Sequence, residues 1–299
     1  MPDYGHDLLF GTFITPANQP AQQPVELAIV ADRAGLDLAM FQDHPYQPRF
    51  HDTWTLLAYA AARTERIHLS GDVLNLPLRQ PAVLARSAAS LDLLSGGRLE
   101  LGIGAGGFWD AIEAMGGRRL TPGQSIEALE EAIEIIRGIW AADVRGGVRV
   151  AGTHYRVDGA KRGPAPAHDI GIWVGAYKPR ILRMTGRVAD GWLPSLGYLP
   201  GGPAALDEMN EHIDDGARAA GREPAAVRRL LNISGQFSAS RAGLLVGPPA
   251  QWADEIAEIA LLHGISGFIV AADDPVTIEL FAAEVAPAAR EAVAAERRA

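Results

Sequence analysis

The strongest constraint on the fold is a regular alternation of short apolar runs with amphipathic helical stretches. Parallel strands need long crossover connections, usually helices, so this alternation predicts a parallel sheet with helices on its faces. Strands buried in this way read as continuous apolar runs. The eight predicted strands are Leu8–Ile14, Leu38–Gln42, Ile67–Val73, Leu99–Ile103, Ile170–Val174, Gly191–Pro194, Leu230–Gln236 and Gly267–Ala271. Eight βα units favour a closed TIM (β/α)8 barrel, whereas five or six would favour an open sheet.

Helix start and stop signals separate the apolar runs. Proline opens several helical stretches, as at Pro24 and Pro81, and Gly35 suits the left-handed position that ends the first. Residues 121–124 read as a capping box with proline in the first turn. Two stretches interrupt the rhythm, a glycine-rich loop at about 104–120 and a hairpin-containing segment at about 143–169. We therefore expect a single domain over residues 1–299 with two insertions on its active-site face.

Charge and composition narrow the range of partners. The 299 residues carry 27 Lys and Arg against 36 Asp and Glu, a formal net charge of −9. This balance, without a basic run, argues against nucleic acid as a partner. Cysteine is absent, which excludes disulfides, thiolate metal ligands and cysteine nucleophiles. With no signal-like start and no apolar stretch of bilayer-spanning length, we expect a soluble, cytoplasmic protein that does not enter a membrane.

The best candidate for a catalytic group is a histidine directly after a predicted strand. Asp43, His44, Pro45 and Tyr46 follow Leu38–Gln42. Residues at the C-terminal ends of barrel strands point into the active site. A histidine beside a carboxylate donates or accepts a proton near neutral pH, so Asp43 and His44 are candidate catalytic residues. The structural alternative is that Asp43 caps the loop and His44 packs against it.

Metal-binding patterns are weak in this chain. His51 and Asp52 follow the candidate histidine closely, but there is no H-x-H pair and no H-E-x-x-H helix. His68 lies inside a predicted strand and is expected to be structural. We therefore expect no metal site.

Two loops are suited to an anionic or planar ligand. The run from Gly102 to Gly107 has the spacing G-x-G-x-x-G, but it follows the fourth strand rather than the first. It therefore indicates a glycine-lined concavity more than a Rossmann site, and a loop without any ligand is the alternative. Residues 175–180 would direct the free N–H groups of a helix toward the barrel mouth, with Lys178 and Arg180 adding positive charge. An ordinary βα turn with surface bases is the alternative there.

Two longer segments carry a resemblance to a known family. The first runs from Arg66 to Gly106 and includes Val73-Leu-Asn-Leu-Pro-Leu-Arg79 and Ser90-Leu-Asp-Leu-Leu-Ser-Gly-Gly-Arg98. The second runs from Ile172 to Ser195 and includes Arg187-Val-Ala-Asp-Gly-Trp-Leu-Pro-Ser195. With them the chain resembles, over about residues 8–270, the luciferase-like flavin-dependent oxidoreductases. That family includes enzymes that use the deazaflavin coenzyme F420.

The resemblance implies a TIM barrel and a set of cofactor contacts. A non-prolyl cis peptide is common at the end of the family's third strand, which corresponds here to Asp72 and Val73. Asp43 and His44 would lie near the reactive edge of the cofactor. The loops that hold the cofactor phosphate correspond to Ala105, Gly106 and Gly107 and to Gly175, Ala176 and Tyr177. Family members are often homodimers, so a homodimer is expected.

Two departures from the family pattern restrict the activity. The family's sugar-phosphate dehydrogenases carry a glutamate near the end of the glycine-rich loop, where this chain has Gly107. A glucose-phosphate substrate is therefore not expected. The bacterial luciferases carry a reactive cysteine, and its absence here argues against light emission.

The resulting prediction is an oxidoreductase that transfers hydride between coenzyme F420 and a small organic substrate, with a separate reductase recycling the cofactor. FMN is the alternative cofactor and would favour oxygen activation by a luciferase-like monooxygenase. A non-catalytic flavin-binding protein and a metal-dependent hydrolase are the further alternatives. The candidates for the substrate side, chosen as aromatic walls or anion contacts, are Phe13, Arg49, His51, Trp109 and Trp192.

Overall fold

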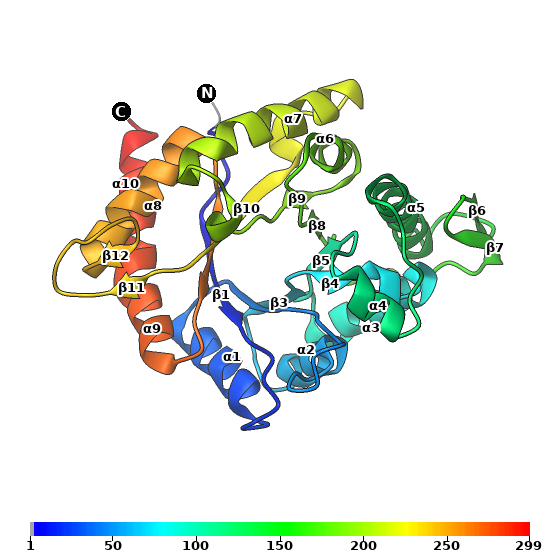
Figure 1. The fold of residues 1–299 in the computed structure, drawn as a ribbon, viewed down its shortest axis with the longest axis horizontal. Coiled ribbons are helices and arrows are strands. Elements are labelled where there is room, and N and C mark those ends of the chain that lie inside the picture. The colour runs from blue at the N-terminus through cyan, green and yellow to red at the C-terminus, as the bar shows by residue number, and fades with distance from the viewer. Residues whose placement is uncertain (1–2) are drawn as a thin grey trace.

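The computed structural model describes residues 3–299, and its central strands form a barrel surrounded by helices (Figure 1). The barrel strands are β1 (Leu9–Ile14), β2 (Leu38–Phe41), β3 (His68–Gly71) continued by β4 (Leu74–Asn75), β5 (Leu101–Gly104), β8 (Ile172–Val174), β9 (Gly191–Trp192), β10 (Arg228–Ile233) and β13 (Gly267–Ala271). All pairings between them are parallel, and β1 lies between β2 and β13. The predicted TIM barrel is confirmed, with a strand at each of the eight predicted positions.

The barrel closes at its third strand, which is divided in two. The first half, β3, pairs with β2, and the second half, β4, pairs with β5. Asp72 and Val73 lie between the halves, and the peptide bond between them is cis. This is the bond that the family resemblance implies.

Helices cover the outside of the barrel. They are α1 (Gln23–Ala34), α2 (Thr53–Ala61), α3 (Pro81–Ser95), α4 (Trp109–Ala114), α5 (Pro122–Trp140), α6 (Pro179–Val188), α7 (Ala205–Ala219), α8 (Pro249–His263), α9 (Pro275–Leu280) and α10 (Ala286–Glu296). Single helical turns lie at η1 (Leu76–Leu78), η2 (Leu196–Tyr198), η3 (Gly202–Ala204), η4 (Pro224–Ala226) and the π-type η5 (Phe281–Val285). The predicted capping box is present, because Thr121 and Gln124 each accept the other's backbone N–H. Within residues 3–299 no helix is long and apolar enough to cross a membrane.

Both predicted irregular stretches depart from the simple βα rhythm. The glycine-rich loop contains the short helix α4, which the sequence patterns did not predict. The second stretch forms the predicted hairpin of β6 (Val148–Ala151) and β7 (Arg156–Ala160), seen beyond α5 in Figure 1. Its expected place on the active-site face is wrong, because the stretch connects the end of α5 to the start of β8 and so leaves the barrel at the N-terminal ends of the strands. The carboxylate of Glu131 on α5 accepts backbone N–H groups from residues 153–155 and so anchors the hairpin turn. A second small pair, β11 (Gln236–Phe237) and β12 (Val246–Gly247), lies outside the barrel.

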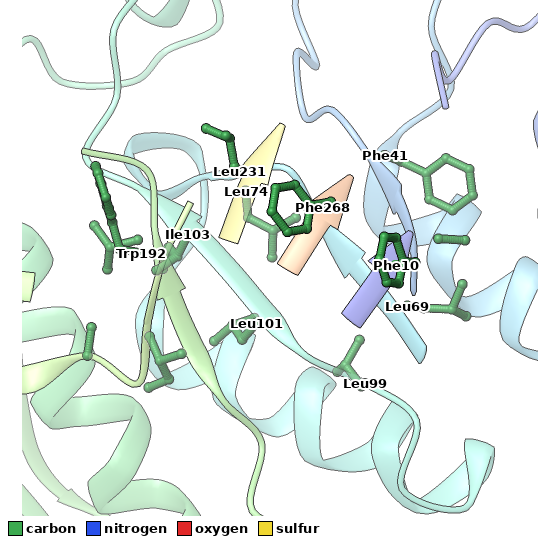
Figure 2. Packing of buried hydrophobic residues seen from close by; sticks show 14 of the residues in the cluster. Phe10, Phe41, Leu69, Leu74, Leu99, Leu101, Ile103, Trp192, Leu231 and Phe268 are labelled. Carbon is green, nitrogen blue, oxygen red and sulfur yellow. The ribbon is translucent and has the colours of Figure 1, made fainter. Parts of the chain in front are cut away.

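The apolar core has two parts, because successive residues of a strand point to opposite faces. One part fills the barrel and consists of Leu38, Met40, Trp173, Leu193, Leu230 and Ile269. The larger part lies between the strands and the helices. Figure 2 shows residues of this outer core, among them Phe10, Phe41, Trp192 and Phe268. The filled interior leaves room for a ligand only at the ends of the barrel.

Candidate active site

A cavity of about 850 Å³ lies at the C-terminal ends of the barrel strands. This volume is within the range of small-molecule sites, and this end of a TIM barrel is where active sites are found. Residues from the ends of all eight strands line it: Phe13, Gln42, Asp43, His44, Tyr46, Asp72, Val73, Leu74, Asn75, Gly104, Ala105, Gly106, Gly107, Phe108, Gly175, Ala176, Tyr177, Lys178, Ile181, Leu193, Ser195, Gly197, Tyr198, Asn232, Ile233, Ser234 and Ala271. The cavity therefore brings together the predicted loops after the second, third, fourth and fifth strands.

Val73 forms part of the cavity wall where it meets the barrel core. Its side chain packs against the inner core and lies close to the glycines that end β5 and follow β8. A Cβ at Gly104 would lie 2.7 Å from Val73 Cγ2, and one at Gly175 would lie 3.2 Å from it. A larger residue at Gly104 would therefore displace the Val73 side chain, and one at Gly175 would make a tight contact with it.

His44 stands in a small aromatic cluster on the cavity wall. Its ring stacks on Tyr46, with centroids 5.3 Å apart, and meets the edge of Phe108 at 5.2 Å. Burial lowers the pKa of His44 from its usual value because the charged imidazolium loses its hydration, while the nearby Asp43 charge acts in the opposite direction. The uncharged imidazole is thus the favoured form at neutral pH, and it is able to accept a proton.

Asp43, the residue before His44, is buried and its carboxylate is hydrogen-bonded to other residues. Its side chain is 0% exposed, and Arg79 binds both carboxylate oxygens, with Nε donating to Oδ2 and Nη2 to Oδ1, each at 2.8 Å. The backbone N–H of Asn75 donates to Oδ2 as well. The sequence predicts a catalytic role for Asp43, and this geometry favours a structural one, because both oxygens are already bound by Arg79 and Asn75. The carboxylate instead fixes the loop that carries His44.

Asp72 presents the second unusual carboxyl group of the site. Its Oδ1 accepts an N–H from Asn232 at 3.1 Å, and Oδ2 is buried. Burial raises the pKa of Asp72 to about 7, with the Asn232 hydrogen bond only partly opposing this effect. The carboxyl group therefore changes charge near neutral pH.

Four buried polar atoms of the cavity residues have no hydrogen-bond partner among residues 3–299. They are Tyr46 Oη, Asp72 Oδ2, Asn75 Oδ1 and Asn232 Oδ1. A buried polar atom without a partner costs about 1–3 kcal/mol, so such atoms are rare and gather where a ligand completes their bonding. The two asparagine oxygens are acceptors, Asp72 Oδ2 accepts when the carboxyl group is ionised and donates when it is protonated, and Tyr46 Oη is a hydroxyl. A planar heterocycle with N–H and carbonyl groups along its edge fits this set.

The two predicted anion-binding loops border the same cavity. At Gly107 a Cβ would have no neighbour within 4 Å, so the backbone is open to a ligand. Lys178 precedes α6 and is the only lysine or arginine among the described lining residues. Tyr177 Oη accepts the N–H of Ser195 at 2.9 Å, which holds the loop after β8 against the loop after β9.

Four of the five predicted substrate-side residues lie outside the cavity lining, and only Phe13 is part of it. Trp192 is wrong as a substrate contact, because it is 0% exposed in the outer core (Figure 2) and its indole N–H donates to the carbonyl of Ala176. Arg49 is exposed on a loop, and His51 Nε2 lies 2.9 Å from the carbonyl oxygen of Ala21. The ring of Trp109 packs behind Gly106, where a Cβ would lie 3.0 Å from Trp109 Cη2.

Several residues that line the cavity were not predicted as site residues from the sequence. Phe108, 62% exposed, and Tyr198, 75% exposed, contribute aromatic surface, and Tyr198 meets the edge of Tyr177. An aromatic residue in a glycine-rich loop after a barrel strand was the available signal for Phe108. Asn75 and Asn232 carried no such signal, because an asparagine at a strand end reads as a turn residue.

Comparison with known proteins gives one family and one fold. The family profile of luciferase-like monooxygenases matches residues 8–242. The chain is 32% identical over 218 residues to an F420-dependent glucose-6-phosphate dehydrogenase of Nocardia farcinica, covering 70% of this chain and 63% of that protein. The enzyme of the same name from Amycolatopsis mediterranei is 30% identical over 215 residues, with the same coverage. The chain thus spans less than two thirds of the length of these relatives.

Solved structures with the same fold superpose on nearly the whole chain. An F420-dependent secondary alcohol dehydrogenase, in complex with an F420-acetone adduct, superposes with a TM-score of 0.82 at 19% identity, covering 95% of this chain and 99% of that one. The oxygenating constituent of 3,6-diketocamphane monooxygenase from Pseudomonas putida, in complex with FMN, superposes with a TM-score of 0.76 at 20% identity, covering 94% and 98%. At these identities the likeness concerns the fold alone.

Proposed function

The chain belongs to the luciferase-like monooxygenase family, and we propose that it is an oxidoreductase that transfers hydride between coenzyme F420 and a small organic substrate. The observation that carries the proposal is the set of four partnerless polar atoms around the main cavity. They match the edge of a planar heterocycle, and the relatives in sequence are named F420-dependent enzymes.

The residues present suit such a cofactor. Asp72, Asn75 and Asn232 would bond the polar edge of the ring, and Val73 would support its face. The proposed phosphate contacts are Ala105, Gly106, Gly107, Gly175, Ala176, Tyr177 and Lys178, which combine open backbone with one positive charge. When bound, coenzyme F420 supplies a hydride to a substrate or accepts one from it.

His44 is the proposed proton carrier. Its lowered pKa keeps the imidazole uncharged at neutral pH, so a ring nitrogen accepts the hydroxyl proton when an alcohol is oxidised and returns it in the reverse direction. Asp43 and Arg79 act as positioning residues, since their ion pair fixes the loop that carries His44.

The substrate we propose is a small uncharged alcohol or ketone. Lys178 is the only lysine or arginine among the described lining residues, and the cofactor phosphate would use it. Phe13, Phe108 and Tyr198 offer aromatic surface instead of charge. The phosphate of a sugar phosphate would therefore have no cationic side chain to bind among the described lining residues. The relatives in sequence are nevertheless named as glucose-6-phosphate dehydrogenases.

The first test is a pair of titrations of the purified protein, one with coenzyme F420 and one with FMN. The chain has six tryptophans, so quenching of their fluorescence reports binding. Saturable binding of F420 alone supports the proposal. Saturable binding of FMN alone favours the second candidate, an FMN-dependent monooxygenase, whose fold the chain shares. Binding of neither refutes both.

A second test separates an enzyme from a protein that only binds the cofactor. In His44→Ala, F420 should bind as before while turnover of a secondary alcohol falls by about 10²–10⁴-fold, the usual contribution of a general base. His51→Ala is the matched control, since His51 lies on the same loop but outside the cavity lining. Equal turnover in the native protein and His44→Ala would remove the proposed role.

Association is the remaining part of the proposal. Val83, Leu93 and Leu94 of α3 are 64%, 49% and 87% exposed, and we propose that they contribute to a homodimer. Light scattering of the native protein and of Leu94→Glu tests this, because a native monomer excludes it. A separate reductase would recycle the cofactor, in the cytoplasm where reduced coenzymes are maintained.

A further inference from the structure

Two histidines and a glutamate converge at the opposite end of the barrel from the main cavity. His68 begins β3, Glu100 directly precedes β5, and His168 lies shortly before β8. His68 Nδ1 is 3.3 Å from Glu100 Oε1, and His168 Nε2 is 3.4 Å from the same oxygen. All three ligand atoms lie within 4.8 Å of one another. The cluster therefore joins the N-terminal ends of three barrel strands.

These separations suit a tetrahedral cation. Metal–ligand bonds of about 2.0–2.1 Å place the ligand atoms of a tetrahedral zinc site about 3.3–3.4 Å apart. Both contacts to Glu100 have this length, and the ligand atoms of the two histidines lie within 4.8 Å of each other. Two imidazoles and one carboxylate form a common protein donor set for Zn²⁺.

Hydrogen bonds from neighbouring residues orient the ligand side chains, as they do in known metal sites. Asp92, fully buried on α3, lies 2.8 Å from His168 Nδ1 through Oδ1, and its Oδ2 accepts the backbone N–H groups of Ala167 and His168. Glu100 Oε2 accepts the N–H of Gly171 at 2.7 Å. Asp92 on the far nitrogen fixes the ring of His168, and Nε2 then faces Glu100 Oε1 at 3.4 Å. A zinc ion bound between these two atoms would take the place of a proton held there, because zinc binding displaces protons from its ligands.

The cluster also opens onto a second cavity. This cavity, of about 590 Å³, is lined by His68 and Glu100. Its lining carries Asp37, Asp169 and Asp190 together with Arg66 and Arg228. Three protein ligands with one position facing a polar cavity leave room for water as the fourth ligand.

We propose that His68, Glu100 and His168 bind one Zn²⁺, with the fourth coordination position open to the second cavity. The ion would crosslink the N-terminal ends of β3, β5 and β8. His168 contributes from the segment that connects the hairpin to β8. The site is independent of the proposed redox activity, because it lies at the other end of the barrel.

The experiment uses untagged, metal-stripped full-length protein without cofactor or substrate. Titration with Zn²⁺ should give one site per chain by calorimetry and raise Tm by about 5 °C at a hundredfold excess over Kd. Co²⁺ should give the intense visible bands of a tetrahedral ion, and the absence of cysteine removes thiolates as a competing source. Mg²⁺, which prefers oxygen ligands, should give neither effect.

His68→Gln and His168→Gln should each lose the Co²⁺ bands and at least 10-fold in Zn²⁺ affinity. His263→Gln is the matched control, because His263 Nδ1 also pairs with one carboxylate, at 2.7 Å from Asp207, and should retain both. His68 is the more exposed ligand, so its substitution should disturb the fold less. If His168→Gln does not fold, the Zn²⁺ affinity of His68→Gln alone tests the proposal. No stoichiometric binding, or unchanged binding in His68→Gln, overturns the proposal and leaves the cluster as an ion-pair network.

Discussion

Replacing Asp72 with asparagine should change how the stability of the fold depends on pH. The pKa of this buried carboxyl group is about 7 in the folded chain against a usual value of 3.8. Between these two values the folded state holds a proton that the unfolded state has released, so the free energy of unfolding falls as pH rises. At about 1.4 kcal/mol for each pKa unit, the full effect is about 4 kcal/mol, of which about 2.5 kcal/mol lies between pH 5 and pH 8.

Urea unfolding of the native protein and of Asp72→Asn at pH 5, 6, 7 and 8 measures this effect. The side-chain amide keeps a polar partner for Asn232, and the difference between the two proteins cancels the titration of all other groups. We expect the stability of Asp72→Asn relative to the native protein to rise by about 2.5 kcal/mol from pH 5 to pH 8. A difference that stays constant within about 0.5 kcal/mol would refute the reasoning, because Asp72 would then ionise alike in both states.

Three further substitutions test the supports of the main cavity. Arg79→Met should destabilise the fold by about 3–5 kcal/mol in urea unfolding, because it leaves the Asp43 carboxylate buried without its partner, and adding Asp43→Asn should recover much of the loss. Trp192→Phe should cost about 1–3 kcal/mol in the same assay, since the Ala176 carbonyl loses its donor, and an unchanged stability would contradict that contact. Phe108→Ala should change stability by less than about 0.5 kcal/mol, because the ring is 62% exposed, but should raise KM for an apolar alcohol; an unchanged KM would exclude Phe108 from the substrate side.

Local sequence signals were enough for the arrangement of the elements. Apolar runs and helix signals predicted the eight barrel strands, and the helix that Thr121 caps begins where the pattern places it. The position of Asp43 and His44 at a strand end also followed from the chain order, since parallel strands of a barrel end on one face. The pattern did not predict α2, α4 or α10. A start signal was present but was not recognised for two of them, because Asp52 caps α2 and Pro287 lies in the first turn of α10. Only α4 lacks both a capping side chain and a proline.

The sequence did not predict whether a strand side chain points into the barrel or toward the helices. Trp173 and Trp192 show the reason. Both lie in short apolar strands that are buried on both sides, so no alternation distinguishes inside from outside. Closure of the barrel places Trp173 in its interior and Trp192 against the helices. The mistaken substrate contact at Trp192 follows from this ambiguity.

The amino-acid sequence by itself determined the barrel, its family and the loops that border the main cavity, because these depend on local periodicity and on chain order. Only the tertiary structure decided which distant side chains meet. Arg79 neutralises Asp43, Asn232 lies against Asp72, and His68 meets Glu100 and His168 across separate βα units. Such contacts depend on strand register and barrel closure, and no local pattern of residues records them.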